Sequence, residues 1–172
     1  MNQPASIQLK SIKPIDRFAY LTATGFGAGF APKAPGTFGA LEGVALFLLT
    51  LALHLSATQH FILLVALNIL IFALGVWASK RTCEISNLED PSQVVVDEIS
   101  GQLIALTPLA FHSSTALIIL AFILFRLFDI FKPYPIRKLE HLPNGFGVML
   151  DDVLAGIFAA LIVWLVSYFR LM

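Results

Sequence analysis

The stretch GVALFLLTLALHLSATQHFILLVALNILIFALGVWAS, residues 43–79, decides the fold because it contains no Asp, Glu, Lys or Arg. As a single helix it would be roughly 55 Å long at about 1.5 Å per residue, whereas the hydrocarbon core of a bilayer is roughly 30 Å thick. The stretch must therefore turn back, and the polar segment HLSATQH at residues 54–60 is where it can do so. We expect two apolar helices, over residues 38–53 and 61–78.

Two later apolar stretches predict further helices. Residues 99–125 also lack charge and are interrupted by FHSS at residues 111–114, which predicts one short helix to about residue 109 and another over residues 115–131. Residues 153–169 form the last apolar stretch. The predicted fold is all-α, a membrane-embedded bundle of about four or five apolar helices with shorter polar helices and loops on the cytoplasmic side.

The composition favours this bundle over a water-soluble one. Hydrophobic residues make up 58% of the chain and charged residues 13%, against roughly 25% charged residues in a soluble domain. A soluble helical bundle is the alternative, but so many apolar helices would leave almost no polar surface to coat it. The formal net charge of zero gives no reason to expect nucleic-acid binding.

Basic residues alternate between the predicted connections, and this alternation predicts the orientation. Cytoplasmic loops of membrane proteins are enriched in Lys and Arg. The N-terminal segment and the second and fourth connections are basic, whereas the first and third connections contain no Lys or Arg; the basic residues are Lys10, Lys13, Arg17, Lys33, Lys80, Arg81, Lys132, Arg137 and Lys138. We expect five crossings with a cytoplasmic N-terminus, to which Arg170 is an exception. Residues 1–17 form a polar tail and residues 18–172 a single domain.

Acidic residues gather at the predicted cytoplasmic helix ends, and none falls in the two opposite connections. Five of them are candidate catalytic residues and metal ligands: Asp97, Glu98, Asp129, Asp151 and Asp152. Any one alone can be a helix cap or a partner of the helix dipole. The two adjacent pairs, however, place like charges beside a region of low dielectric, which is costly unless a cation compensates. Carboxylate oxygens suit the hard ion Mg²⁺, which is therefore the expected cofactor.

Cations near these acids predict an anionic substrate. Arg126 lies inside an apolar run, where a charge requires a partner, and it shares a helix face with Asp129 three residues later. Lys132 precedes two prolines that end the helix. Arg can hold a phosphate through two hydrogen bonds, and Lys supplies a point charge. The alternative for Lys132 is a juxtamembrane residue attracted to anionic lipid.

Three blocks of this sequence resemble one known family. They are APKAPGTFGA at residues 31–40, VVVDEISGQ at residues 94–102, and FRLFDIFKPYPIRKLEHLPNGFGVMLDDVLAG at residues 125–156. The spacing Arg-x-x-Asp-x-x-Lys-Pro-x-Pro-Ile-Arg, followed by Gly-x-Gly and Asp-Asp, is the most specific part. Together the blocks are similar to phosphatidylglycerophosphatase A, with the resemblance spanning about residues 18–170.

The resemblance implies an activity and a set of site residues. The family removes the terminal phosphate from phosphatidylglycerophosphate to give phosphatidylglycerol, depends on Mg²⁺, and works in the bacterial inner membrane with its site facing the cytoplasm. The matching polar positions are Lys33, Thr37, Asp97, Glu98, Arg126, Asp129, Lys132, Asp151 and Asp152. Lys33, Thr37, Arg126 and Lys132 are implied to bind the substrate phosphate. One departure is Asn144, which stands where the family usually has glycine.

The residues leave the details of the reaction open. Cys83 is not followed by the Arg of a cysteine phosphatase, and no aspartyl-phosphate or phosphohistidine block occurs. Hydrolysis by a metal-activated water is therefore expected, with Asp97, Glu98, Asp151 or Asp152 as general base and an Asp nucleophile as the alternative. Three further functions compete with this one: a different lipid phosphate hydrolase, a CDP-alcohol phosphotransferase, whose four-Asp spacing does not fit, and a small cation transporter. Transport sites usually lie near the bilayer midplane rather than at helix ends.

Overall fold

The computed structural model describes residues 13–88, 91–139, 142 and 145–169 of the chain. In these ranges every regular element is a helix, as predicted. The elements are α1 (Pro14–Ala23), η1 (Gly25–Phe30), α2 (Pro35–Leu51), α3 (Ala57–Ser86), α4 (Val96–Leu106), η2 (Thr107–Ala110), α5 (Thr115–Phe131), α6 (Ile136–Leu139) and α7 (Phe146–Tyr168). Most of the predicted polar tail and the substituted loop position Asn144 lie outside the described residues.

Short polar side chains and left-handed residues set the ends of the two helices that follow the polar turns. Ser56 caps α3, since its hydroxyl accepts from the Gln59 amide while the Gln59 side chain accepts from the Ser56 amide. Ser114 caps α5 by accepting from the amide of Leu117 at 3.2 Å. Left-handed backbone at Asn87 and Lys132 ends these two helices. The predicted turn at residues 111–114 is thus confirmed, and the one predicted at residues 54–60 is shorter, because α3 already begins at Ala57.

The lengths of the apolar helices differ from the prediction. Within the described residues two helices are long and apolar enough to cross a membrane, α3 with 30 residues and α7 with 23, fewer than the four or five expected. α2 and α5 have 17 residues each. α4 has 11 residues and passes into the 3-10 turn η2 at Pro108, because proline removes a helical hydrogen-bond donor.

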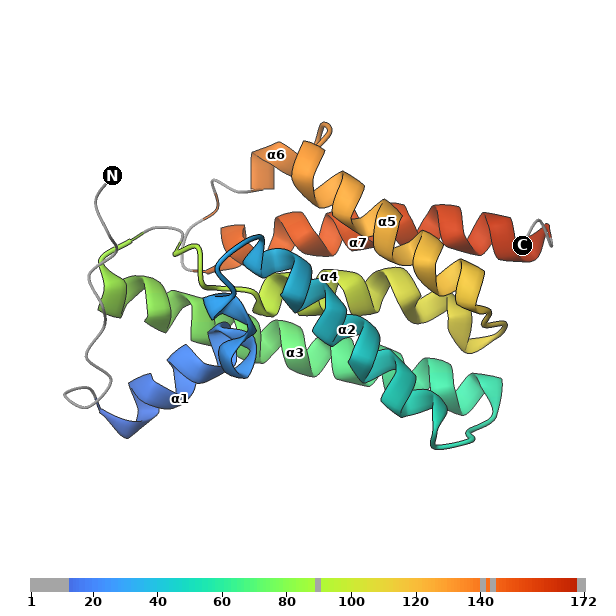
Figure 1. Ribbon diagram of the computed structural model, residues 1–172, viewed down its shortest axis with the longest axis horizontal. Helices are drawn as coiled ribbons and strands as arrows, with labels where there is room; N and C mark the ends of the chain where they lie inside the picture. The colour runs from blue at the N-terminus through green and yellow to red at the C-terminus, as the bar shows by residue number, and fades with distance from the viewer. Residues whose placement is uncertain (1–12, 89–90, 140–141, 143–144, 170–172) are drawn as a thin grey trace.

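Helix α4 occupies the centre of the bundle and packs most extensively on α7 and α2 (Figure 1). Its contact with α7 is close because glycines face each other: a Cβ on Gly156 would lie 2.3 Å from the Gly101 carbonyl oxygen. The largest core cluster contains Phe47, Leu103 and Phe125, which come from α2, α4 and α5. This packing brings the first turns of α2, α4 and α7 to the same end of the bundle, where α5 ends (Figure 1).

Candidate active site

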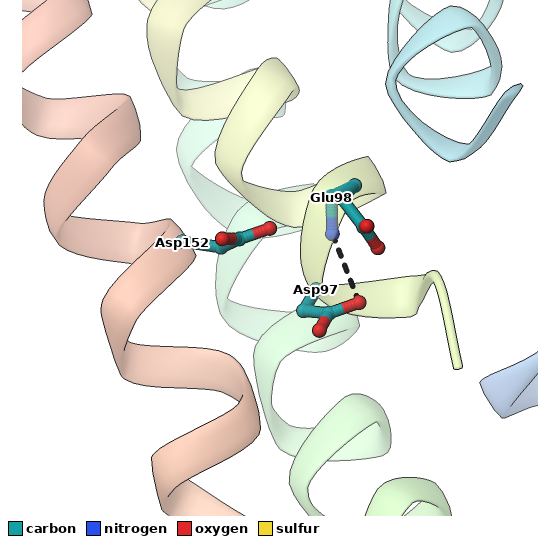
Figure 2. Close-up of side chains that lie close together, drawn as sticks. All are labelled: Asp97, Glu98 and Asp152. Atoms are coloured by element: carbon teal, nitrogen blue, oxygen red, sulfur yellow. Dashed lines mark hydrogen bonds between the residues drawn. The ribbon is translucent and has the colours of Figure 1, made fainter. Parts of the chain in front are cut away.

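Three carboxylates from two helices meet at this end of the bundle. Asp97 and Glu98 lie in the first turn of α4, and Asp152 reaches toward them from α7 (Figure 2). One ligand atom from each residue lies within 4.8 Å of the others. Residues separated by about fifty positions in the sequence thus form one acidic cluster, which is the convergence that the sequence predicted for these three side chains.

The electrostatics of the cluster are those of crowded, buried acids. The Glu98 amide donates to Asp97 Oδ1 at 3.1 Å, as the dashed line in Figure 2 marks. Burial, followed by the neighbouring Glu98 carboxylate, raises the pKa of Asp97 well above its usual range. Glu98 Oε2 and Asp152 Oδ2 are buried and have no hydrogen-bond partner within the described residues. Such a set of oxygens fits a divalent cation better than it fits helix capping.

The other two predicted acids lie in ion pairs. Arg126 NH1 lies 2.5 Å from Asp129 Oδ2 and 3.9 Å from Glu98 Oε1, so the guanidinium joins α5 to the acidic cluster. Lys132 Nζ lies 2.6 Å from Asp151 Oδ2. The sequence grouped five acids into one metal set. The structure brings ligand atoms of three of them together, and Asp129 and Asp151 lie next to these three, each with a basic partner.

The start of α2 forms the wall of the site opposite α7. A Cβ on Gly36 would lie 2.0 Å from Glu98 Oε1 and 3.1 Å from Arg126 NH1. Any side chain at this position would therefore displace the acid or the guanidinium, and sequence reasoning missed this role of Gly36. The signal was present in the Pro-Gly-Thr of the first block, where a glycine stands in the first turn of an otherwise regular helix.

The two remaining predicted phosphate ligands, Thr37 and Lys33, differ in how far they are exposed to solvent. Thr37 follows Gly36 in the first turn of α2 and is partly buried. Lys33 is exposed in the loop before α2 and makes no ion pair with the described acids. The helix start itself offers amide donors and the positive end of a dipole beside Arg126, which is the usual setting for a bound anion.

The sequence profile of phosphatidylglycerophosphatase A matches residues 21–167, a range that includes every residue of this site. The chain belongs to the phosphatidylglycerophosphatase A family. Its members are lipid phosphatases, so the protein is an enzyme of that class. The acidic cluster, the Arg126 pair and the Lys132 pair all lie within the range that matches this family.

Curated relatives cover most of the chain. A Haemophilus influenzae protein named phosphatidylglycerophosphatase A is 40% identical over 88% of this chain and 90% of its own length. The Escherichia coli K12 protein of the same name is 33% identical over 87% of this chain and 83% of its own length. A Bacteroides thetaiotaomicron protein named putative phosphatidylinositol-3-phosphatase is 42% identical over 83% of this chain and 89% of its own length. No solved structure matches the chain.

Proposed function

We propose that this protein is a Mg²⁺-dependent phosphatidylglycerophosphatase, which hydrolyses the terminal phosphate monoester of phosphatidylglycerophosphate to phosphatidylglycerol and inorganic phosphate. The observation that carries the proposal is the cluster of Asp97, Glu98 and Asp152 beside the partly buried Arg126. A phosphate monoester needs this combination, because its oxygens can be shared between a metal ion and a guanidinium. The names of two relatives support the same substrate.

The three clustered carboxylates would hold the metal. They are hard oxygen donors in number and spacing suited to Mg²⁺, which usually keeps water in its remaining positions. Mg²⁺ bound there would neutralise phosphate oxygens and lower the pKa of a water molecule. No Cys or His takes part in the cluster, so the donor set does not favour zinc.

The protein's own residues would bind and orient the phosphate. Arg126, held by Asp129, supplies the charge that stabilises the phosphoryl group in transfer. Lys132, held by Asp151, adds a second positive charge at the edge of the site. Water attacks phosphorus, the bond to the glycerol oxygen breaks, and that oxygen takes up a proton. A carboxylate of the site accepts the proton of the attacking water, and the pH–rate profiles of single Asn and Gln variants would assign it.

We further propose that the protein is embedded in the bacterial inner membrane with this site at the cytoplasmic face. α3 and α7 are long enough to span a bilayer. Large apolar side chains are exposed on the outer faces of several helices, among them Leu49 at 68%, Ile69 at 66% and Ile123 at 56%, which is unfavourable in water over so large an area. Lys80 lies against Gly145 at the start of α7, and Lys132 pairs with Asp151, so these basic residues are at the site end of the bundle, as the rule for basic cytoplasmic loops requires.

Phosphate release in lipid bilayers tests the proposal. Purified protein in proteoliposomes should release phosphate from phosphatidylglycerophosphate with Mg²⁺ and stop when a chelator is added. Phosphatidylinositol 3-phosphate is tested as a second substrate, because one relative is named putative phosphatidylinositol-3-phosphatase. Preferential hydrolysis of this inositol lipid would mean that the substrate is not phosphatidylglycerophosphate. Full activity in chelator would reject the requirement for Mg²⁺. Ion flux without hydrolysis would favour a transporter.

A further inference from the structure

Gln102 is a fully buried amide in the middle of α4, with 0% of its surface exposed. Neither its Oε1 nor its Nε2 has a hydrogen-bond partner in the part of the chain that the structure describes. A buried amide is costly unless both its acceptor and its donors are paired. Gln102 belongs to the second sequence block, but the proposed reaction gives it no role.

Gln102 lies one helical turn after Glu98 in α4, farther into the bundle than the acidic cluster. Glu98 lies four residues earlier and therefore on the same face of α4. Both residues face the glycines of α2: a Cβ on Gly39 would lie 3.3 Å from Glu98 Cβ, and one on Gly43 would lie 2.9 Å from Gln102 Cβ. Helical side chains generally lean toward the N-terminus of their helix, and this tendency favours an amide position of Gln102 on the side of the turn that carries Glu98.

Two neighbouring groups lack the partners that an amide can supply. Glu98 Oε2 and Arg126 Nε are both buried without a hydrogen bond within the described residues, and the two side chains approach each other to 3.9 Å. A glutamine Nε2 donates and an Oε1 accepts, so the amide matches the carboxylate with its donors and the guanidinium with its acceptor. Buried waters typically link such groups through two to four hydrogen bonds.

We propose that Gln102 is a positioning residue for the phosphatase reaction, whose amide fixes the orientation of Glu98 and Arg126 through a shared buried water. This inference rests on the proposed function. It assigns no contact between Gln102 and the substrate: the amide lies beneath the groups that bind metal and phosphate. Outer groups of this kind, which orient a metal ligand, typically change metal affinity or activity by about 10- to 100-fold when they are removed.

The test compares Gln102→Met with Ser100→Ala. Methionine keeps the length and volume of the side chain and removes the amide. Ser100 is the matched control because it is also in α4, 0% exposed and without a hydrogen-bond partner in the described residues, but it lies two positions away and so points to a different side of the helix. Each variant is assayed for kcat, KM and, without substrate, for the Mg²⁺ concentration that gives half of the Mg²⁺-dependent rise in Tm.

We expect Gln102→Met to fold with a Tm near that of the wild type, to lose about 10- to 100-fold in kcat with little change in KM, and to need about 10-fold more Mg²⁺ for half of the Tm rise. Ser100→Ala should match the wild type in all three measurements. Wild-type kcat and Mg²⁺ midpoint in Gln102→Met would overturn the proposal and leave Gln102 a core residue. Equal losses in both variants would overturn it as well.

If Gln102→Met does not fold, Gln102→Asn decides, because asparagine keeps an amide but sets it back by one methylene. A folded Gln102→Asn with reduced kcat and a raised Mg²⁺ midpoint supports positioning, and one with wild-type values contradicts it. Absence of hydrolysis by the wild-type protein would defeat the proposed function instead. The Mg²⁺ midpoint of the Tm rise would still report on Gln102 in that case.

Discussion

The two ends of the bundle differ in whether their buried polar side chains have hydrogen-bond partners. At the end where α2 meets α3, the buried polar groups are paired: Thr50 Oγ1 lies 2.8 Å from His60 Nε2, and the imidazole stacks on Phe47 with ring centroids 5.6 Å apart. At the other end, Asp97, Glu98 and Asp152 crowd together, and oxygens of Glu98 and Asp152 lack a partner in the described chain.

This difference separates a structural polar site from a binding one. A paired group such as Thr50–His60 stabilises the fold by itself, because each donor has found its acceptor. A group of like charges destabilises the fold until a ligand compensates it. Removal of the first kind should lower stability and leave turnover unchanged, whereas removal of the second kind should lower turnover without lowering the stability of the metal-free protein. Single substitutions at either end test whether stability and turnover depend on different ends of the bundle.

The largest effect is expected for Asp152→Asn. Asparagine keeps the shape of the side chain but removes the negative charge from the metal cluster, so phosphate release should fall about 1,000-fold or more, the upper range for loss of one stabilising group. The Tm without Mg²⁺ should stay the same or rise, because one repulsive charge is gone. A rate of hydrolysis within a few-fold of the wild-type rate would show that Asp152 has a structural role in α7 and does not take part in the reaction.

A smaller loss is expected for Arg126→Lys. Lysine keeps the positive charge but cannot reach both Asp129 and a phosphate with the two-pronged geometry of a guanidinium, so kcat should fall about 100-fold. Arg81→Lys is the matched control, since Arg81 pairs with Asp16 at 2.8 Å on a more exposed surface. Equal effects of the two substitutions would mean that only charge is needed at Arg126.

The stability of the metal-free protein should fall as pH rises. The pKa of Asp97 is raised in the folded protein, whereas the unfolded chain has the ordinary pKa of about 3.9. At a pH between these two pKa values the folded state therefore binds more protons than the unfolded state. Stability is then complete below that window and is lost as pH increases through the raised pKa. Bound Mg²⁺ compensates the ionised carboxylate, so saturating Mg²⁺ should flatten the slope of Tm against pH. Identical slopes with and without Mg²⁺ would contradict a metal at Asp97.

The sequence predicted the helices well because their signal is local. Charge-free stretches and the polar turns located α2 and α5 within a few residues, whereas α3 ends later and α7 begins earlier than predicted. Their lengths were less predictable, since α3 continues to Ser86 through charged residues by packing on α1. Hydropathy cannot register such tertiary packing.

The convergence of the acids was predicted, whereas the Lys132–Asp151 pair and the close contact of Gly36 were not. The positions of the five acids at helix ends follow from helix register, so their convergence at one end could be read from the chain. Which cation pairs with Asp151 depends on the side on which α5 and α7 pack, whereas the Arg126–Asp129 pair follows from their three-residue spacing within α5. The structure gives Asp151 to Lys132 and Asp129 to Arg126. The glycine in the first turn of α2 marks Gly36 as unusual, but the residues that it contacts depend on how α2 packs against α4 and α5.

The smallest effect on activity is expected for Thr50→Val, at the opposite end. Valine has nearly the same shape but removes the hydroxyl, which leaves the buried His60 without its partner and costs about 1–3 kcal/mol of stability. The Tm in detergent should therefore fall, whereas kcat per folded molecule should remain at the wild-type value, because the helices that carry the carboxylates start at the other end of the bundle. Thr37→Val is the matched control, as it removes the same hydroxyl from the same helix beside the site. A kcat loss in Thr50→Val as large as that in Thr37→Val would mean that the two ends are coupled, and that pairing at one end helps to set the geometry at the other.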